Sequence, residues 1–145
     1  MKLVSIIIPM HNAERYIERC IHSLTAQIYQ EIEILVIDDG STDNSVKIVK
    51  MLSEEDRRIR YITKKKGNIS TARNTGLEQM QGEYFAFVDS DDFVHPDYIN
   101  GLVKCMEEKD ADLVICGHRS IKEHKNGHCE VIKDIIPQRY ERFKH

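Results

Sequence analysis

Residues 32–45, IEILVIDDGSTDNS, pass from an apolar run directly into a polar turn. The run Ile32–Ile37 has the character of a strand buried on both faces of a parallel sheet. The turn is rich in residues that cap helix N-termini, and Val46, Val49 and Leu52 then form one apolar helical stripe. A strand, a capping turn and a helix in this order predict a βαβ unit.

The same alternation extends on both sides of this stretch. Apolar runs predict further strands at residues 3–8, 59–62, 84–88 and 113–116. Helical spacing of apolar side chains predicts helices at residues 16–24, 69–80 and 96–106. We therefore expect a Rossmann-like three-layer α/β/α domain with a mostly parallel sheet over residues 1–117. Residues 118–145 show neither period clearly and form a separate segment.

The composition is that of a globular protein with a packed core. The 145 residues are 41% hydrophobic and 31% charged, and the formal net charge is −3. A nucleic-acid-binding protein usually carries a strong positive charge, so this composition does not indicate one. The only basic run, Lys64-Lys65-Lys66, is interpreted as a solvated loop. No apolar stretch approaches the roughly 20 residues of a transmembrane helix, and a cytoplasmic location is expected.

Four cysteines, at positions 20, 105, 116 and 129, show no C-x-x-C spacing. Cys20 and Cys105 occupy apolar helix positions, and Cys116 lies in an apolar run. We expect reduced thiols in the core of a cytosolic protein rather than disulfides or a zinc site.

An acidic turn, Asp89-Ser90-Asp91-Asp92, directly follows the apolar run 84–88. Three carboxylates within four residues repel one another unless they share a cation. Magnesium and manganese ions prefer oxygen ligands and often use one or two carboxylates together with substrate phosphates. The turn therefore fits either a metal and diphosphate site or an Asp-rich cap for the helix that begins near Pro96.

Two more polar segments are expected on the same rim, because ligands of such sheets bind beyond the carboxyl ends of the strands. One Asp suffices to cap a helix, so the pair Asp38 and Asp39 suggests a further task, such as accepting a base N–H or a ribose hydroxyl. The Arg73 guanidinium could bridge a carboxylate of this second turn and a diphosphate. A plain capped turn and a surface arginine are the alternatives. Gly76 suggests close packing or close approach of a ligand.

Four segments, taken together, resemble the glycosyltransferase family 2 enzymes, which have the A-type nucleotide-diphospho-sugar transferase fold. The segments are Val4–Glu14, Ile37–Asp43, Ala72–Gly76 and Phe87–Asp92. Each is moderately specific alone, whereas their shared order and spacing are highly specific. The resemblance covers residues 3–117.

The resemblance implies a role for each matching position. Asp39 would bind the base, expected to be uracil, and Arg73 would lie near the nucleotide. Asp89 and Ser90 would approach the ribose, and Asp89 and Asp91 would hold Mn²⁺ or Mg²⁺ at the donor diphosphate. The other positions expected to line the nucleotide pocket are Pro9, His11, Asn12, Glu14 and Asp38.

Members of the family transfer a sugar from a nucleoside-diphosphate donor, here a UDP-sugar, to an acceptor hydroxyl with inversion. The resemblance implies a saccharide or lipid-linked acceptor in bacterial polysaccharide synthesis, with peripheral association at the inner face of the membrane. The general base usually follows the fifth strand; Glu130 and Asp134 do not match its motif, and neither is assigned. Residues 118–145 are expected to be a truncated acceptor-side segment or a C-terminal extension.

Other classes of protein stay open beside this one. A non-catalytic nucleotide-sugar-binding module, or an inactive truncated donor domain, would keep the pocket without the chemistry. A nucleotidyltransferase shares the sheet and the acidic site, but it usually holds its triphosphate with a Gly-rich basic loop, and Pro9–Glu14 contains no Gly. A Rossmann dehydrogenase is disfavoured because no G-x-G-x-x-G follows the first strand.

Overall fold

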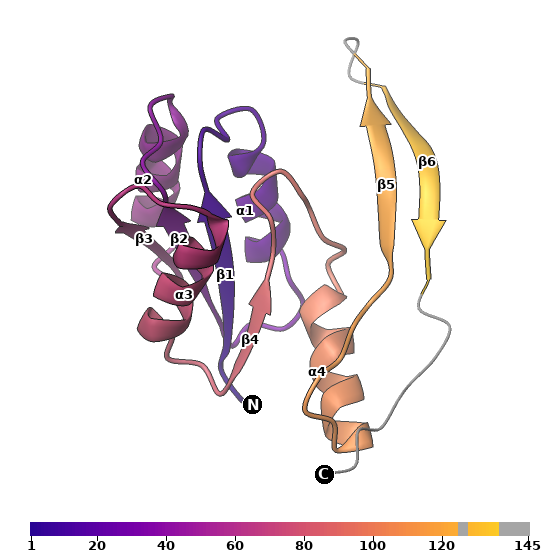
Figure 1. Cartoon of the computed structure of the whole chain (residues 1–145). Coiled ribbons are helices and arrows are strands. Elements are labelled where there is room, and N and C mark those ends of the chain that lie inside the picture. Colours follow the sequence, from indigo (N-terminus) through magenta and orange to yellow (C-terminus); the bar gives the residue numbers. More distant parts are fainter. Residues whose placement is uncertain (125–127, 137–145) are drawn as a thin grey trace. The chain divides into compact units, whose positions relative to one another are not determined.

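The computed structural model of the chain describes residues 1–124 and 128–136, which fall into two units, Met1–Ile99 and Asn100–His145. The first unit contains four parallel strands in the order β3-β2-β1-β4 (Figure 1). They are β1 (Val4–Met10), β2 (Ile32–Asp38), β3 (Ile59–Thr63) and β4 (Tyr84–Phe87).

Three helices connect these strands: α1 (Ile17–Thr25), α2 (Ser45–Glu55) and α3 (Ile69–Gln79). The chain steps from β1 through β2 to the edge strand β3 and then returns past both to β4. Since crossovers are right-handed, this reversal places α3 on the face opposite α1 and α2. Figure 1 shows α3 in front of the sheet and the other two helices behind it. The expected three-layer α/β/α fold is confirmed.

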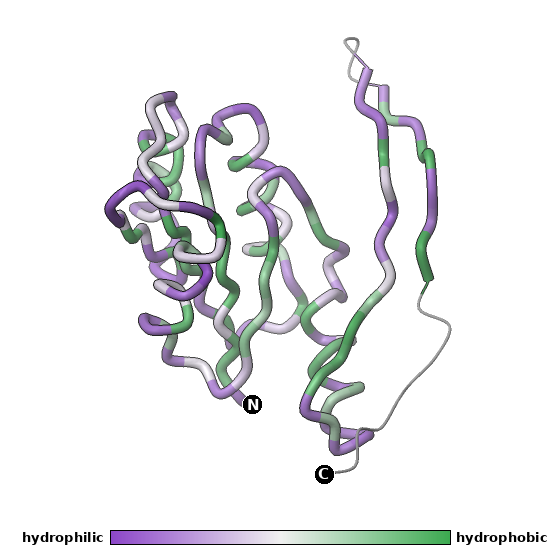
Figure 2. The backbone as a smooth tube through the Cα atoms, in the orientation of Figure 1, coloured by the Kyte–Doolittle hydropathy of each residue, from purple (hydrophilic) through white to green (hydrophobic). Residues whose placement is uncertain are grey.

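The core follows from the two strands at the centre of the sheet. Every residue of β1 and β2 is buried, as expected for strands covered on both faces. On the α3 side, Ile7, Leu35 and Ile37 pack with Ala72 and are fully buried. Figure 2 shows β1 as a largely hydrophobic segment. Burying each large aliphatic side chain contributes about 1.5–3 kcal/mol, so these two strands contribute substantially to the stability of the unit.

The reversal of strand order beside β1 also decides where a ligand can bind. β1 leads toward β2 on one side and pairs with β4 on the other. At such a switch point the loops that follow the strands diverge and leave a crevice at the carboxyl edge. The loops after β1, β2 and β4 all meet this edge.

The predicted strand at residues 113–116 is wrong, because the described chain forms no strand there. Leu113 and Ile115 are 68% and 70% exposed. An apolar run becomes a strand only where a neighbouring strand supplies backbone partners, and this run pairs with none of the described strands. The expected core position of Cys116 is wrong for the same reason, since its side chain is exposed.

The other cysteines differ in burial. Cys20 is buried as expected, Cys105 is half-buried and Cys129 is exposed, and all four cysteines are free thiols. The second unit contains most of α4 (Tyr98–Lys109) and an antiparallel pair, β5 (His118–Glu123) and β6 (Cys129–Ile135). Every described residue of β6 is exposed, which explains why the sequence shows no alternation there. Part of the 118–145 segment, residues 125–127 and 137–145, lies outside the described residues.

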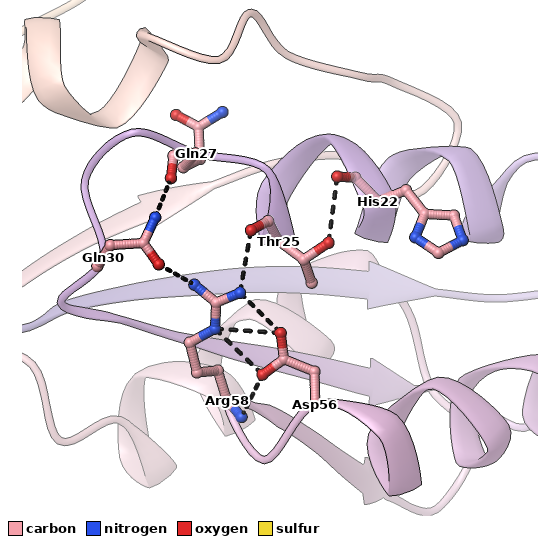
Figure 3. Close-up of polar contacts among 6 residues, drawn as sticks. All are labelled: His22, Thr25, Gln27, Gln30, Asp56 and Arg58. Atoms are coloured by element: carbon pink, nitrogen blue, oxygen red, sulfur yellow. Dashed lines mark hydrogen bonds and ion pairs between the residues drawn. The ribbon is translucent and has the colours of Figure 1, made fainter.

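A polar network lies at the amino-terminal ends of the strands, opposite the carboxyl edge where a ligand is expected (Figure 3). The Arg58 guanidinium donates through Nη2 to Asp56 Oδ2 at 2.7 Å and to the Thr25 carbonyl at 3.0 Å. Its Nη1 donates to Gln30 Oε1 at 3.2 Å. One side chain therefore joins the end of α1, the loop before β2 and the loop before β3.

Replacing Arg58 with Met is expected to lower the free energy of unfolding by about 1–2 kcal/mol, because a partly buried charged network is lost. The side chains of Arg58 and Asp56 are only 23% and 24% exposed. Arg58 holds the pKa of Asp56 below its usual value, so this stabilisation is present at neutral pH and is lost as pH falls below about 4. Chemical denaturation at pH 7 and pH 3 checks both statements. Met at the exposed Arg57 is the control, and equal losses in the two variants would contradict the assignment.

Candidate functional site

The loops after β1 and β2 are joined by side chains that cross between them. Asn12 Oδ1 accepts a bond from the Thr42 backbone N–H at 2.8 Å, and the Asn12 N–H donates to Ser41 Oγ at 3.0 Å. Glu14 Oε2 accepts from the Asn44 backbone and side-chain nitrogens at 2.8 and 2.9 Å. Asn12 and Glu14 were expected to line a nucleotide pocket. In this structure their polar atoms hold the two loops together.

Asp38 shapes the turn that follows β2. Its Oδ1 accepts from the Ser41 N–H at 2.9 Å and its Oδ2 accepts from the Tyr61 hydroxyl at 3.0 Å. Burial and the bond to Asp38 raise the pKa of Tyr61, so the hydroxyl stays protonated and donates. Gly40, at φ 80°, lets the backbone reverse immediately afterwards. One oxygen of Asp38 is thus engaged in the turn and the other in a bond to β3.

Asp39 is 8% exposed and takes different partners. Its Oδ1 accepts from Lys64 Nζ and from the Gly67 N–H, the latter at 2.8 Å. The bond from Lys64, with that from Gly67, holds the pKa of Asp39 below its usual value. Asp39 is therefore an ionised, oriented carboxylate on the rim.

The acidic turn after β4 is held against α1. The Asp92 N–H donates to the Asp89 carbonyl at 3.0 Å, and Cys20 Sγ lies 3.6 Å from the same oxygen. Farther along, the buried Gln27 side chain donates to the His95 carbonyl at 2.8 Å. Contacts at Asp89, and at His95 three residues beyond the turn, therefore hold this segment beside α1 and the residues that follow it.

Arg73 joins α3 to this turn. Its Nη2 donates to Asp89 Oδ1 at 2.8 Å, and its guanidinium carbon lies 5.3 Å from the centre of the Phe87 ring. Its Nε is a buried side-chain nitrogen without a hydrogen-bond partner among the described residues. The sequence-based expectation that Arg73 bridges a carboxylate of the second turn is wrong in this structure. Arg73 instead pairs with Asp89, the carboxylate that follows β4, and its guanidinium lies near the Phe87 ring.

The four remaining expected residues lie at the end of β1, just beyond it, and in the acidic turn. Pro9 is buried within β1, and His11 is exposed just beyond that strand. His11 lies near enough to Asp39 to favour its ionised form. Ser90 is half-buried and Asp91 is exposed in the acidic turn.

The acidic turn concentrates negative charge in a way that suits a metal ion. Burial, followed by the charges of Asp92, Asp91 and Asp89, raises the pKa of the Cys20 thiol to about 12. The Asp89 carboxylate is paired with Arg73. No three His, Cys, Asp or Glu side chains converge into a complete metal site within residues 1–124 and 128–136. The turn suits a cation held by one or two carboxylates whose shell is completed by phosphate oxygens.

Lys64 is the rim residue that sequence reasoning missed. The run 64–66 was interpreted as a solvated loop, but the Lys64 side chain is only 13% exposed and is paired with Asp39. Lys65 and Lys66 are exposed as expected. Lys64 directly follows β3, whose carboxyl end lies on the same edge as β2. This position after a strand was the signal that could have identified it.

The fold and the rim together define an α/β domain of the kind that binds its ligand at a topological switch point. The model of the family "Glycosyl transferase family 2" matches residues 5–142. The chain belongs to glycosyltransferase family 2, as the four sequence segments indicated.

Individual relatives agree with this assignment. The chain is 44% identical over 120 residues to "Glycosyltransferase GlyA" of Streptococcus pneumoniae, which covers 83% of the chain and 17% of the relative. It is 44% identical over 115 residues to "Uncharacterized glycosyltransferase EpsJ" of Bacillus subtilis, which covers 79% and 33%. The chain therefore spans one third or less of these two proteins.

Solved structures show the same fold. S. aureus TarS 1-349 in complex with UDP-GlcNAc superposes with a TM-score of 0.71 at 31% identity, covering 76% of this chain and 32% of that one. A mannosyltransferase of Pyrobaculum calidifontis, solved with GDP-Man and Mn²⁺, gives a TM-score of 0.69 at 24% identity, covering 80% and 34%. None of the described helices has the length and apolar character needed to cross a bilayer.

Proposed function

We propose that this chain is the donor-binding part of a metal-dependent, inverting glycosyltransferase that uses a UDP-sugar. The observation that carries the proposal is the presence of two acidic turns on one rim, Asp39 after β2 and Asp89–Asp92 after β4, on either side of β1. Two strand spacings separate them, about 10 Å. A nucleoside diphosphate has its base and its phosphates at opposite ends, which suits this separation. The complexes of TarS with UDP and UDP-GlcNAc support uridine as the nucleoside.

Each residue has a defined role in this proposal. Asp39 accepts an N–H of the base, and Asp89, oriented by Arg73, faces the ribose and the cation. Asp91, which is exposed, is the second carboxylate for the cation. A bound Mn²⁺ or Mg²⁺ would stabilise the negative charge that develops on the leaving diphosphate. An acceptor hydroxyl, on a saccharide or a lipid-linked saccharide, displaces that diphosphate with inversion.

A second candidate is a donor-binding module without transfer activity. The observation in its favour concerns Glu130 and Asp134, the two acidic residues that were considered as general bases. Asp134 accepts bonds from Arg119 at 2.7 and 2.9 Å, and Glu130 lies 3.2 Å from the His124 ring nitrogen. Both carboxylates thus already have hydrogen-bond partners within this unit, and turnover of a UDP-sugar by the chain would argue against this second candidate.

Calorimetric titration of the chain with UDP tests the proposed function. We expect UDP to bind in the presence of manganese, and we expect its affinity to fall at least about ten-fold when a chelator removes the metal. A rise in the melting temperature with UDP and manganese should accompany binding, because a ligand of the folded state stabilises it. No detectable UDP binding with manganese present would refute the proposal.

A further inference from the structure

Lys64 lies beside the carboxylate assigned to the nucleobase, and its contacts are unusual for a loop lysine. Its Nζ donates to Asp39 Oδ1 and to the Lys65 carbonyl, the latter at 2.8 Å. Its backbone N–H donates to the Asp38 carbonyl at 3.2 Å, which continues the pairing of β3 with β2. Both the backbone N–H and the side-chain ammonium group of Lys64 are therefore held by hydrogen bonds. It is a fixed cation on the rim.

The two oxygens of Asp39 have different environments. Oδ1 receives the two donors, Lys64 Nζ and the Gly67 N–H. Oδ2 accepts no hydrogen bond from the described residues, yet it is not among the side-chain atoms that are buried without a partner. Oδ2 therefore reaches solvent. One oxygen orients the carboxylate, and the other is available to a ligand.

Lys64 also has a hydrogen atom left for a ligand. An ammonium group has three N–H donors, and two of them are used by Asp39 and by the Lys65 carbonyl. The rim therefore presents an acceptor, Asp39 Oδ2, and next to it an ammonium group, on Lys64, with one N–H that these two contacts do not use. Such a pair matches a ligand edge on which an N–H stands beside a carbonyl.

Resting on the proposed function, we propose that Lys64 is a base-recognising residue that determines specificity for uracil. Asp39 Oδ2 accepts the N3–H of the base, and Lys64 donates to an adjacent carbonyl oxygen. The uracil N3–H is flanked by a carbonyl on both sides, so Lys64 finds an acceptor in either orientation of the ring. Cytosine has no hydrogen at N3 and carries one carbonyl. Hydrogen bonds to charged groups are among the stronger ones, so the contribution of Lys64 is measurable.

The test compares the wild-type chain with Lys64→Met, using UDP and 3-methyluridine diphosphate with manganese present. The second nucleotide lacks the N3–H and carries a methyl group where Asp39 must approach. We expect Lys64→Met to weaken UDP about ten-fold. We expect the methylated nucleotide to bind weakly to the wild-type chain, with little further change in the variant. Lys65→Met is the matched control, because the Lys65 side chain is exposed, and it should leave UDP binding unchanged.

Several results would overturn the role of Lys64. If Lys64→Met binds UDP as tightly as the wild-type chain, Lys64 makes no contribution to binding the base. If it binds UDP more tightly, the ion pair of Lys64 with Asp39 competes with the base. If Lys64→Met loses the same affinity for UDP and for 3-methyluridine diphosphate, Lys64 acts through its positive charge in general and does not recognise the base. Lys64→Gln keeps an N–H donor and should lose less than Lys64→Met, which separates recognition from a failure of the loop to fold. If the wild-type chain binds no UDP, the proposed function fails; if it binds UDP and Lys64→Met binds it equally well, only the role of Lys64 fails.

Discussion

Asp91→Ala is expected to weaken the manganese-dependent binding of UDP by about 100-fold, or roughly 2.7 kcal/mol. In the proposed site Asp91 is an exposed carboxylate of the acidic turn, whereas Asp89 is already neutralised in part by Arg73. Removing Asp91 leaves one partly neutralised carboxylate and the phosphates to hold the cation. Calorimetry with and without manganese should then give the same weak affinity for the variant.

The control for this prediction is Glu78→Gln, which removes one negative charge from an exposed position on α3. It should leave the affinity for UDP unchanged within two-fold or so, because exposed charges are screened by salt. Asp91→Ala should also keep the melting temperature of the chain without ligand, since its side chain is exposed. If Asp91→Ala retains the full effect of manganese, the metal is held elsewhere and the proposed role of the acidic turn is wrong.

Gly76→Ala is expected to destabilise the first unit by about 2 kcal/mol, although Ala usually favours a helix by up to about 1 kcal/mol over Gly. A Cβ at position 76 would lie 2.3 Å from Ile7 Cγ2 and 3.1 Å from Ile7 Cγ1. Ile7 is fully buried in β1 and cannot move aside without disturbing the core. Of the two reasons suspected for this glycine, close packing is the one this contact supports. Thermal and urea denaturation measure the loss, expected as about 8–16 °C in the melting temperature of this unit.

Gly101→Ala provides the matched control within the same chain. Gly101 is also inside a helix, α4, but a Cβ there would meet nothing within 4 Å. This substitution should be neutral or should stabilise the helix by up to about 1 kcal/mol, because only the helix propensity changes. Opposite signs for the two substitutions are the expected result. A stabilising Gly76→Ala would show that α3 does not approach β1 as closely as the structure indicates.

Most of the fold could be predicted from the sequence because it depends on local patterns. The apolar runs of β1 and β2 and the helical stripes of α1 to α3 lie where their spacing indicated, within one or two residues. Two features were not predicted: residues 113–116 have the composition of a strand but no partner strand among the described residues, and the β5–β6 pair lies where no strand was expected. Composition determines whether a run can be buried, whereas pairing depends on what lies next to it.

The site divides in the same way between local and tertiary information. By itself, the sequence determined that acidic turns follow the second and fourth strands and that the parallel topology brings them to one rim. Only the tertiary structure decided that Asp38 is engaged in its own turn, that Arg73 pairs with Asp89, and that Lys64 holds Asp39. Lys64 and Asp39 are 25 positions apart in sequence, and they meet because β3 lies beside β2. Such pairs depend on the order and register of the strands, and the local spacing of residues in the sequence does not determine either.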